Sequence, residues 1–161
     1  MDGLKFDLRI YVLLYGINPM RIFLFKDGLV RFATEPYVKP DGDNIENLFM
    51  HLTNYAINKN NEHFVENEAD SVESDLDDDN AHKRSLKWLY WNLKTQGYDT
   101  KRLKEKIKDI IIKTIITAQP SISHTVKSCQ PEDIENQLCF QILGFDVILD
   151  SNLKPWLLEV N

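Results

Sequence analysis

The stretch that decides the fold is GFDVILDSNLKPWLLEVN, residues 144–161. It contains two short apolar runs, residues 145–149 and 156–160, separated by the Asp-Ser-Asn sequence at residues 150–152. Side chains of these three types bond to their own backbone and therefore favour turns. The stretch predicts a β-hairpin.

Three oxygen-bearing side chains fall at one end of this predicted hairpin. Asp146 lies at the start of the first run, and Glu159 and Asn161 lie at the end of the second. Alternate strand residues share a face, and an antiparallel return brings Asp146 near the other two. Such oxygens suit Mg²⁺, which also takes substrate phosphates. The alternative, carboxylates that are solvated or that cap a turn, stays open on spacing alone.

The composition is that of a folded chain. Its 161 residues suffice for one domain with a core, and 43% of them are hydrophobic, which argues against global disorder. No apolar run approaches the roughly 20 residues of a membrane span, and the first residues show no signal-peptide pattern. Cys129 and Cys139 are expected to be reduced thiols of a cytosolic protein.

Acidic residues are concentrated in one segment. Residues 66–79 contain eight Asp and Glu and no Lys or Arg. The whole chain carries a net charge of −6, whereas the remainder has 17 acidic and 19 basic residues, about +2. Residues 60–82 therefore predict a disordered loop. An acid-rich Ca²⁺ loop is the weaker alternative, because the glycine and ligand spacing of an EF-hand are missing.

Residues 6–14, FDLRIYVLL, are rich in β-branched and aromatic types and predict a strand. Alternation places one apolar face on Phe6, Leu8, Ile10, Val12 and Leu14, and leaves Asp7, Arg9, Tyr11 and Leu13 on the other. An Arg in so apolar a run needs a partner. Either it pairs with Asp7 or another acid, or it binds a phosphate, which suits its planar guanidinium.

After a turn at residues 16–19, two short strands are predicted over residues 21–25 and 29–34. The Asp27-Gly28 sequence between them is a strong hairpin signal. Arg31 falls within the second strand, where it is either a solvent-facing residue or a ligand for substrate, and spacing alone favours the solvent-facing role.

Residues 44–52 predict a short helix with Asn44 as N-cap and Asn47 at its third position. In the following HLTNYAINK segment, Thr53 and Asn54 lie beside Tyr55, which we expect in the core. The pattern alone predicts turn chemistry here, with Asn54 bonding to backbone.

Two amphipathic helices are predicted, one over residues 85–95 that ends at Gly97 and one from Asp99 or Thr100 to about Ala118. The first buries Leu86, Leu89, Tyr90 and Leu93, with Trp88 and Trp91 beside them. The second buries Leu103, Ile107, Ile110, Ile111, Thr114 and Ile115. Its lysines at 101, 104 and 108 share another face, which is either solvated or meets an acidic partner.

The segment after these helices predicts three short pieces. Residues 119–124, which include Pro120, predict a linker, and residues 129–136 predict the start of a short helix. Residues 137–143 are apolar and enter the terminal hairpin through Gly144.

Residues 143–161 resemble the C-terminal signature of the tubulin tyrosine ligase-like family, a group of ATP-grasp amino-acid ligases. Further segments resemble the family in the same order: KFDLRIYVLL (5–14), KDGLVRFATEPY (26–37), FMHLTNYAINK (49–59) and HKRSL (82–86). The resemblance covers nearly all of the chain outside residues 65–81. It implies an α/β fold, with a mainly antiparallel sheet and packed helices. Residues 1–161 would form the C-terminal part of an ATP-grasp domain, a fragment without its N-terminal half or whatever follows Asn161.

The resemblance also implies roles for single residues. The Mg²⁺ ligands would be Asp146, Glu159 and Asn161. Binding of ATP would involve Lys5, Asp7, Arg9, Thr53 and Asn54. Arg31 would hold an acidic group of the substrate, and Arg9 and Arg31 would be the catalytic residues.

The function implied by the resemblance is that of an ATP-dependent carboxylate–amine ligase similar to tubulin polyglutamylases. Such an enzyme adds glutamate to γ-carboxylates in tubulin tails through an acyl phosphate. We expect ATP and Mg²⁺ as cofactors, and microtubules with acidic tails and free glutamate as partners. We expect no nucleic acid or membrane partner, and a cytoplasmic, cytoskeletal location, with the cilium or basal body as a further site. The alternatives are a tubulin glycine or tyrosine ligase and a non-catalytic microtubule-binding fragment. The isolated chain is expected to be inactive.

Overall fold

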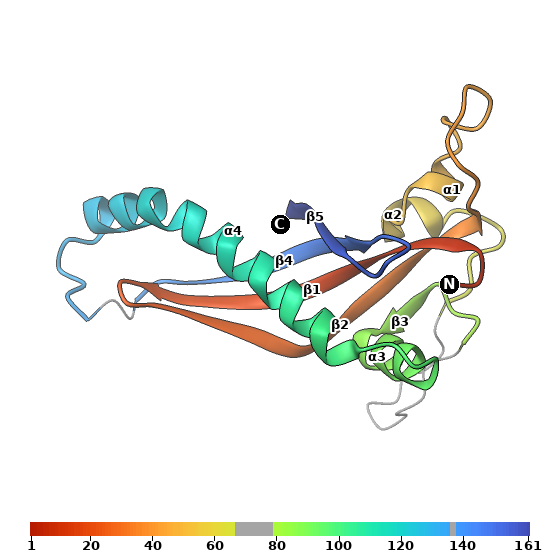
Figure 1. Ribbon diagram of the computed structural model, residues 1–161. Coiled ribbons are helices and arrows are strands. Elements are labelled where there is room, and N and C mark those ends of the chain that lie inside the picture. The colour runs from red at the N-terminus through yellow and green to blue at the C-terminus, as the bar shows by residue number, and fades with distance from the viewer. Residues whose placement is uncertain (67–78, 136–137) are drawn as a thin grey trace. The chain divides into compact units, whose positions relative to one another are not determined.

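The computed structural model describes residues 1–66, 79–135 and 138–161. The strands are β1 (Leu4–Ile17), β2 (Met20–Pro36), β3 (Lys83–Ser85), β4 (Phe140–Leu149) and β5 (Pro155–Val160). The helices are α1 (Leu48–His51), α2 (Tyr55–Asn58), α3 (Leu86–Thr95) and α4 (Thr100–Cys129). The strand order in the sheet is β3-β2-β1-β4-β5 (Figure 1), and β2 pairs with β3, and β4 with β5, in antiparallel fashion. The predicted α/β class with a mainly antiparallel sheet is confirmed.

The chain divides into two compact units. Unit 1 comprises Met1–Arg9 and Asp27–Tyr98, and unit 2 comprises Ile10–Lys26 and Asp99–Asn161. The strands β1 and β2 therefore contribute residues to both units.

The core of unit 1 lies between the sheet and α3. Val30 and Leu89 are fully buried, and the Phe32 ring packs 5.4 Å from that of Phe6 and edge-on at 6.2 Å from that of Trp88. The predicted helix over residues 85–95 is confirmed as α3. It begins where the Ser85 hydroxyl accepts a hydrogen bond from the Trp88 amide at 3.0 Å.

Gly97 ends α3 as predicted. Its φ is +86°, a left-handed conformation that glycine adopts without steric cost. The Gly97 amide donates to Lys94 O and the Tyr98 amide donates to Leu93 O, both at 3.0 Å. This pair of bonds is the Schellman pattern, which satisfies carbonyls that a helix end leaves without partners.

The Asp27-Gly28 sequence does not form a turn, so the predicted hairpin at that point is wrong. Both residues lie inside the continuous strand β2. A Cβ on Gly28 would lie 2.4 Å from Arg9 O and 2.7 Å from Leu86 Cδ1, so the glycine permits close packing. The Asp27 carboxylate accepts hydrogen bonds from the amides of Gly28 at 2.8 Å and Lys87 at 3.2 Å. The pair thus joins the strand to the first turn of α3.

The predicted helix over residues 44–52 is shorter than expected. Helix α1 has Asn47 as its N-cap, without a side-chain capping bond. Asn44 belongs to the preceding turn, where its Oδ1 accepts from the Asp41 amide at 3.1 Å and its Nδ2 donates to Lys39 O at 3.1 Å. These local bonds compete with helix formation.

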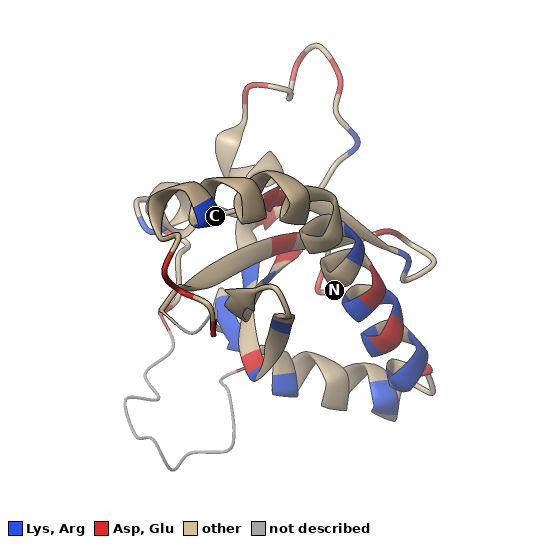
Figure 2. Ribbon diagram, turned by 90° about the vertical axis from the view of Figure 1, so that its left-hand side faces the viewer, with Lys and Arg blue, Asp and Glu red and all other residues tan. Residues whose placement is uncertain are grey.

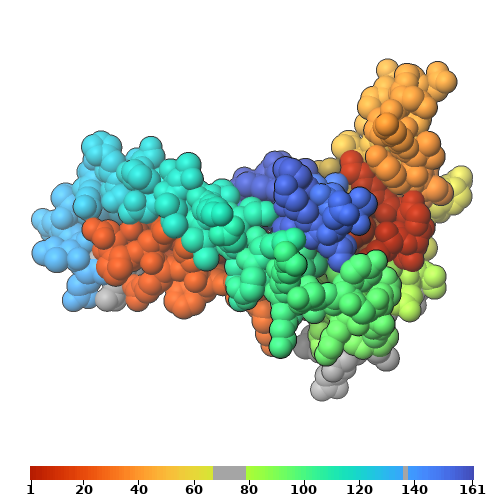
Figure 3. Space-filling view, viewed as in Figure 1, coloured from red at the N-terminus to blue at the C-terminus, as the bar shows by residue number. Residues whose placement is uncertain are grey.

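The core of unit 2 lies between the sheet and α4. The alternation predicted for β1 is confirmed, since Ile10, Val12 and Leu14 are all buried. The predicted stripe of α4 is buried at Leu103, Ile107, Ile111 and Ile115, whereas Ile110 and Thr114 are half-buried. Figure 3 shows the second half of α4 lying over the tip of the β1–β2 hairpin. There the side-chain Nε2 of Gln119 donates to Ile17 O at 3.2 Å.

Helix α4 is longer than predicted, because it continues through Pro120 to Cys129. A proline inside a helix removes one backbone donor and clashes with the carbonyl four residues earlier, at a cost of about 3 kcal/mol. That carbonyl belongs to Ile116, a residue that is 54% exposed, so water can take the place of the lost donor. The predicted linker at residues 119–124 is therefore wrong.

The predicted short helix over residues 129–136 is also wrong within the described residues. Cys129 ends α4, and residues 130–135 form turns. The apolar segment that follows becomes β4, which begins at Phe140 and runs through Gly144 into the terminal hairpin.

Most of the predicted acidic loop, residues 67–78, lies outside the described residues. Its flanks are joined to each other, because the His82 amide donates to Val65 O and the Val65 amide donates to His82 Nδ1, both at 3.0 Å. Within the described ranges, none of the helices is long and apolar enough to cross a membrane.

Candidate functional site

The terminal hairpin brings together the three side chains that the sequence predicted as metal ligands. Asp146 of β4 lies directly opposite Glu159 of β5, and the register shifts at the next position. Asn161 extends the pairing, because its amide donates to Gly144 O at 2.9 Å and its carbonyl accepts from the Gly144 amide at 2.8 Å. The Asn161 Nδ2 donates to Glu159 Oε1 at 3.1 Å.

The electrostatics of this cluster suit a cation. Two carboxylates directly opposite each other on neighbouring strands repel. Asp146 is 2% exposed, whereas Glu159 and Asn161 are exposed. Two carboxylates and one amide oxygen form the hard donor set that Mg²⁺ takes. The cluster contains only two side chains of the types His, Cys, Asp and Glu. Within the described ranges, no group of three or more such side chains could hold a metal.

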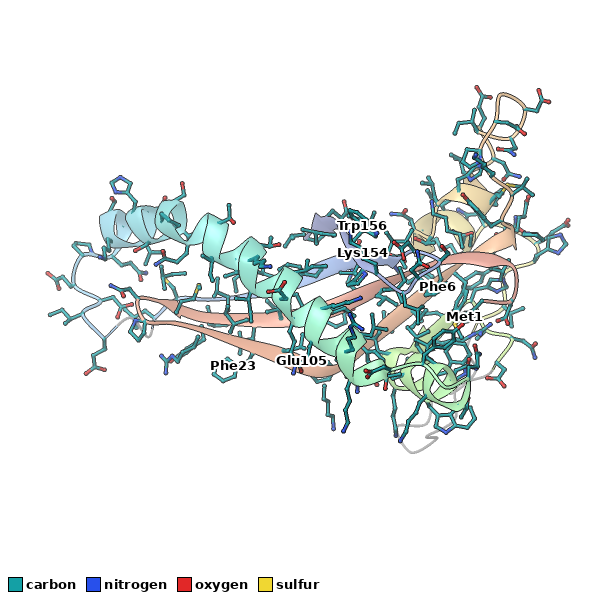
Figure 4. All side chains as sticks on the ribbon, viewed as in Figure 1. Met1, Phe6, Phe23, Glu105, Lys154 and Trp156 are labelled. Carbon is teal, nitrogen blue, oxygen red and sulfur yellow. The ribbon has the colours of Figure 1, made fainter. Side chains whose placement is uncertain are left out.

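The turn of the hairpin is fixed by Asp150. Its carboxylate accepts from the amides of Asn152 and Lys154 at 2.9 Å and from the Trp156 indole at 3.0 Å. The Trp156 bond and then the Lys154 amide bond lower the pKa of Asp150 below its ordinary value. The Lys154 ammonium lies 3.7 Å from the centre of the Trp156 ring, and both side chains are labelled in Figure 4. This turn sets the register of residues 147–149 against residues 155–157, and the register shift between Asp146 and Val147 then pairs Asp146 with Glu159.

In unit 1, Asp7 and Arg31 form a two-pronged ion pair. The Arg31 Nε donates to Asp7 Oδ1 at 3.0 Å, and its Nη2 donates to Asp7 Oδ2. The Asp7 side chain is 2% exposed and that of Arg31 is 13% exposed. Arg31 is therefore not a solvent-facing strand residue, which is the role that its spacing favoured. Arg9, two residues along β1, is half-buried.

Lys5 is held by a residue that sequence reasoning did not select. Its ammonium donates to the His51 carbonyl at 2.6 Å. The buried His51 ring places Nε2 at 3.0 Å from Asn44 O and 3.1 Å from Asn44 Oδ1, two acceptors that favour the proton on Nε2. Nδ1 can then only accept a hydrogen bond, and no donor within the described ranges reaches it. In the sequence, only the place of His51 in the HLTN segment (51–54) pointed to this residue.

A second residue that sequence reasoning missed, Asn58, organises the segment of Thr53 and Asn54. It is 1% exposed. Its Oδ1 accepts from the Thr34 amide at 3.0 Å and hydroxyl at 2.9 Å. Its Nδ2 donates to Leu52 O at 2.8 Å and Asn54 O at 3.1 Å. A polar residue one turn after Asn54 in the YAIN sequence was the available signal.

Around Asn58, Thr53 is buried, and Asn54 is the exposed N-cap of α2, without a capping bond from its side chain. The predicted turn is present, but its side-chain bonds come from Asn58. Tyr55, expected in the core, is 41% exposed, because its ring packs on the surface against that of Phe64 at 5.8 Å.

Comparison with known proteins decides the family. The model of the tubulin-tyrosine ligase family matches residues 1–161. The chain belongs to the tubulin-tyrosine ligase family. The family assignment made from sequence is confirmed, and with it the ATP-grasp type of fold.

Individual relatives in the tubulin-tyrosine ligase family match over the whole chain. The chain is 55% identical to a probable beta-tubulin polyglutamylase of Tetrahymena thermophila, of which it covers 13%. It is 48% identical to tubulin polyglutamylase ttll6 of Danio rerio, covering 19%, and 44% identical to human tubulin polyglutamylase TTLL7, covering 18%. The chain thus spans less than a fifth of the length of each of these relatives.

Proposed function

We propose that the protein carrying this chain is an ATP-dependent ligase that adds glutamate to γ-carboxylates of glutamate side chains in tubulin tails. The observation that carries the proposal is the identity of 44–55%, over all 161 residues, to proteins named tubulin polyglutamylases. Identity at that level to polyglutamylases favours glutamate over glycine or tyrosine as the added residue.

The terminal hairpin supports the requirement for a metal. Asp146, Glu159 and Asn161 would hold Mg²⁺, because their oxygens lie at one end of β4 and β5 in a fixed register. A bound Mg²⁺ neutralises phosphate charge and orients the phosphates. The two opposed carboxylates would attract the cation. The side-chain Nδ2 of Asn161 limits the movement of Glu159 through its 3.1 Å hydrogen bond to Glu159 Oε1.

The polar residues of unit 1 support the binding of ATP. ATP supplies the phosphoryl group that converts the acceptor carboxylate into an acyl phosphate, which a free amine can attack. The His51 carbonyl orients the Lys5 ammonium, and Asp7 orients the Arg31 guanidinium, so both cations are positioned before substrate arrives. Arg9 would bind phosphate oxygens and Arg31 an acidic substrate group. Thr53 and Asn54, on the segment fixed by Asn58, would line the nucleotide site.

The partners proposed are microtubules, through the acidic tails of tubulin, and free glutamate. This places the protein in the cytoplasm on the cytoskeleton, with the cilium or basal body as a further site.

The test is a ligation assay on the native polypeptide that carries this chain at the length of its relatives. The assay supplies ATP, Mg²⁺, microtubules and labelled glutamate. Wild-type protein should incorporate label, and Glu159→Gln should reduce incorporation at least a hundredfold, because it removes an anionic Mg²⁺ ligand.

Glu132→Gln is the matched control, because Glu132 is an exposed carboxylate in the turn after α4. Its incorporation should equal that of wild type. Wild-type turnover in Glu159→Gln would refute the metal assignment. Incorporation of glycine or tyrosine in place of glutamate would refute the choice of amino acid. Salt-sensitive pelleting with microtubules, without incorporation of any of the three, would identify a binding module.

A further inference from the structure

The first seven residues of β2, residues 20–26, form an edge of the sheet within the described part of the chain. β3 pairs with β2 at Leu29, Val30 and Arg31, and the other neighbour of β2 is β1. The outer backbone groups of residues 20–26 therefore have no neighbouring strand among the residues that the structure describes. Such an edge is a template for the addition of another strand.

This edge is unusually apolar on both of its faces. Phe23 is 53% exposed, Leu24 41% and Phe25 55%. Figure 4 shows the Phe23 side chain directed away from the ribbon. Exposed apolar edge strands promote association, and proteins normally avoid or cover them.

The side chains of the edge line a groove on each side of the strand. The groove toward α4 has a volume of about 380 Å³ and is lined by Met20, Ile22, Leu24, Lys108, Ile111 and Ile112. The groove on the other face has a volume of about 450 Å³ and is lined by Tyr11, Val12, Leu13, Phe23, Leu24, Phe25 and Ile142. An added strand would place alternate side chains in each groove.

Basic residues flank the edge and indicate the charge of its partner. Exposed Arg21 and Lys26 stand at its two ends, and the Arg21 guanidinium lies 4.4 Å from the centre of the Tyr15 ring. Lys108, which lines the first groove, already pairs with Glu105 at 2.7 Å and adds no free charge. Antiparallel pairing of two copies about the centre of this segment would place Arg21 opposite Lys26. Like charges opposite each other oppose that pairing.

We propose that residues 21–26 of β2 bind an extended segment of a partner protein by strand addition. That segment has apolar side chains at alternating positions and an acidic residue at each end.

The backbone pattern identifies which groups would bind. The Phe32 amide donates to His82 O at 2.9 Å, on the β3 side of β2. Successive residues of a strand direct their amides to opposite edges. The amides of Ile22, Leu24 and Lys26 therefore point to the free edge.

The test titrates the 161-residue chain with a synthetic hexapeptide, blocked at its termini, that has Glu at both ends and alternating Val and Thr between them. Binding should perturb the backbone amide NMR signals of residues 21–26. The same peptide with Lys at both ends should bind roughly tenfold more weakly. A peptide N-methylated at alternate amides should not bind, because it cannot complete the ladder.

Two variants at one position separate the backbone from the side chain. Leu24→Pro removes an outward amide and should abolish binding, whereas Leu24→Val keeps the amide and should retain it. Circular dichroism checks that both fold. The double variant Arg21→Glu/Lys26→Glu provides a second measurement if Leu24→Pro fails to fold. It should reverse the preference between the Glu-ended and Lys-ended peptides.

Three results would overturn the proposal. One is an absence of binding by the Glu-ended peptide. Another is an unchanged peptide preference in the charge-reversal variant. The third is a stable wild-type dimer in sedimentation, if forming the dimer perturbs the backbone amide NMR signals of residues 21–26. A second copy of the chain would then occupy the edge.

Discussion

Charged side chains are arranged differently in two regions, the Asp7–Arg31 pair of β1 and β2 and the terminal hairpin β4–β5. In the first, a buried carboxylate meets a guanidinium through two hydrogen bonds. In the second, Asp146 and Glu159 are directly opposed residues of β4 and β5, the two strands of the terminal hairpin in Figure 1. The first arrangement pairs opposite charges, whereas the second places two like charges on opposed residues, which repel. The comparison shows opposite charges paired in one region and like charges brought together in the other, and the second arrangement is the basis of the proposed cation site.

The largest expected effect comes from breaking the completed pair. Arg31→Met leaves the Asp7 carboxylate, 2% exposed, without its two-pronged partner. Loss of one partner of a buried pair costs about 3–5 kcal/mol. Denaturant unfolding should show this loss, and the double variant Asp7→Asn/Arg31→Met should recover part of it. A loss below about 1 kcal/mol for Arg31→Met would mean that the pair contributes little to stability.

The next effect concerns Tyr90 of α3, a half-buried residue of unit 1. Burial, and then the charge of Asp27, raise the pKa of Tyr90 to about 12 from 10.0. The folded protein holds the phenol proton more tightly than the unfolded chain. Stability should therefore fall as pH rises from about 10 to about 12, by about 2–3 kcal/mol. The free energies of unfolding of wild type and Tyr90→Phe, plotted against pH, should diverge over this range. Parallel curves would mean that the pKa of Tyr90 is not raised in the folded protein.

A smaller effect of opposite sign is expected at the hairpin. Glu159→Gln removes one of two opposed carboxylates, so stability without divalent cations should rise by about 0.2–1 kcal/mol. Added Mg²⁺ should raise the melting temperature of wild type and leave that of the variant unchanged. A clear destabilisation by Glu159→Gln would show that Glu159 holds the hairpin rather than a cation.

The smallest effect concerns the turn. The Trp156 indole and the Lys154 amide lower the pKa of Asp150. The contribution of Asp150 to stability is therefore present above its ordinary pKa and is lost as the pH falls through the lowered pKa. The indole N–H resonance of Trp156 should titrate with a midpoint below 3.8. Asp150→Asn should remove this titration. A midpoint at the ordinary value would mean that the hydrogen bonds of the turn are weak.

Periodicity predicted the parts of the fold in which burial alternates regularly. The alternate residues from Leu8 to Leu14 and the α4 stripe were correct, because one face of each element is buried. The hairpin at residues 144–161 was also correct, because its turn residues and apolar runs agree. The opposition of Asp146 and Glu159 also depends on the register shift between Asp146 and Val147, which alternation alone does not contain, and the metal-binding role of the cluster stays a prediction.

The errors arose where tertiary packing overrides a local signal. Asp27-Gly28 has the sequence of a turn, yet its glycine serves the close approach of Arg9 and Leu86. Pro120 usually ends a helix, yet the affected residue, Ile116, is exposed to water. The pairing of Arg31 with Asp7 depends on contacts between strands, which spacing within either strand does not contain.

The bonds between Val65 and His82 have a practical consequence. They join two positions that are 17 residues apart in the chain, so the framework does not depend on the length between them. Each doubling of a loop adds only about 0.6 kcal/mol of closure cost. Insertion of a fluorescent protein or an affinity tag directly after Glu66 should therefore leave both units folded. Insertion beside Asp79 or Ala81 should instead disturb the Trp88–Asp79 hydrogen bond and a buried side chain.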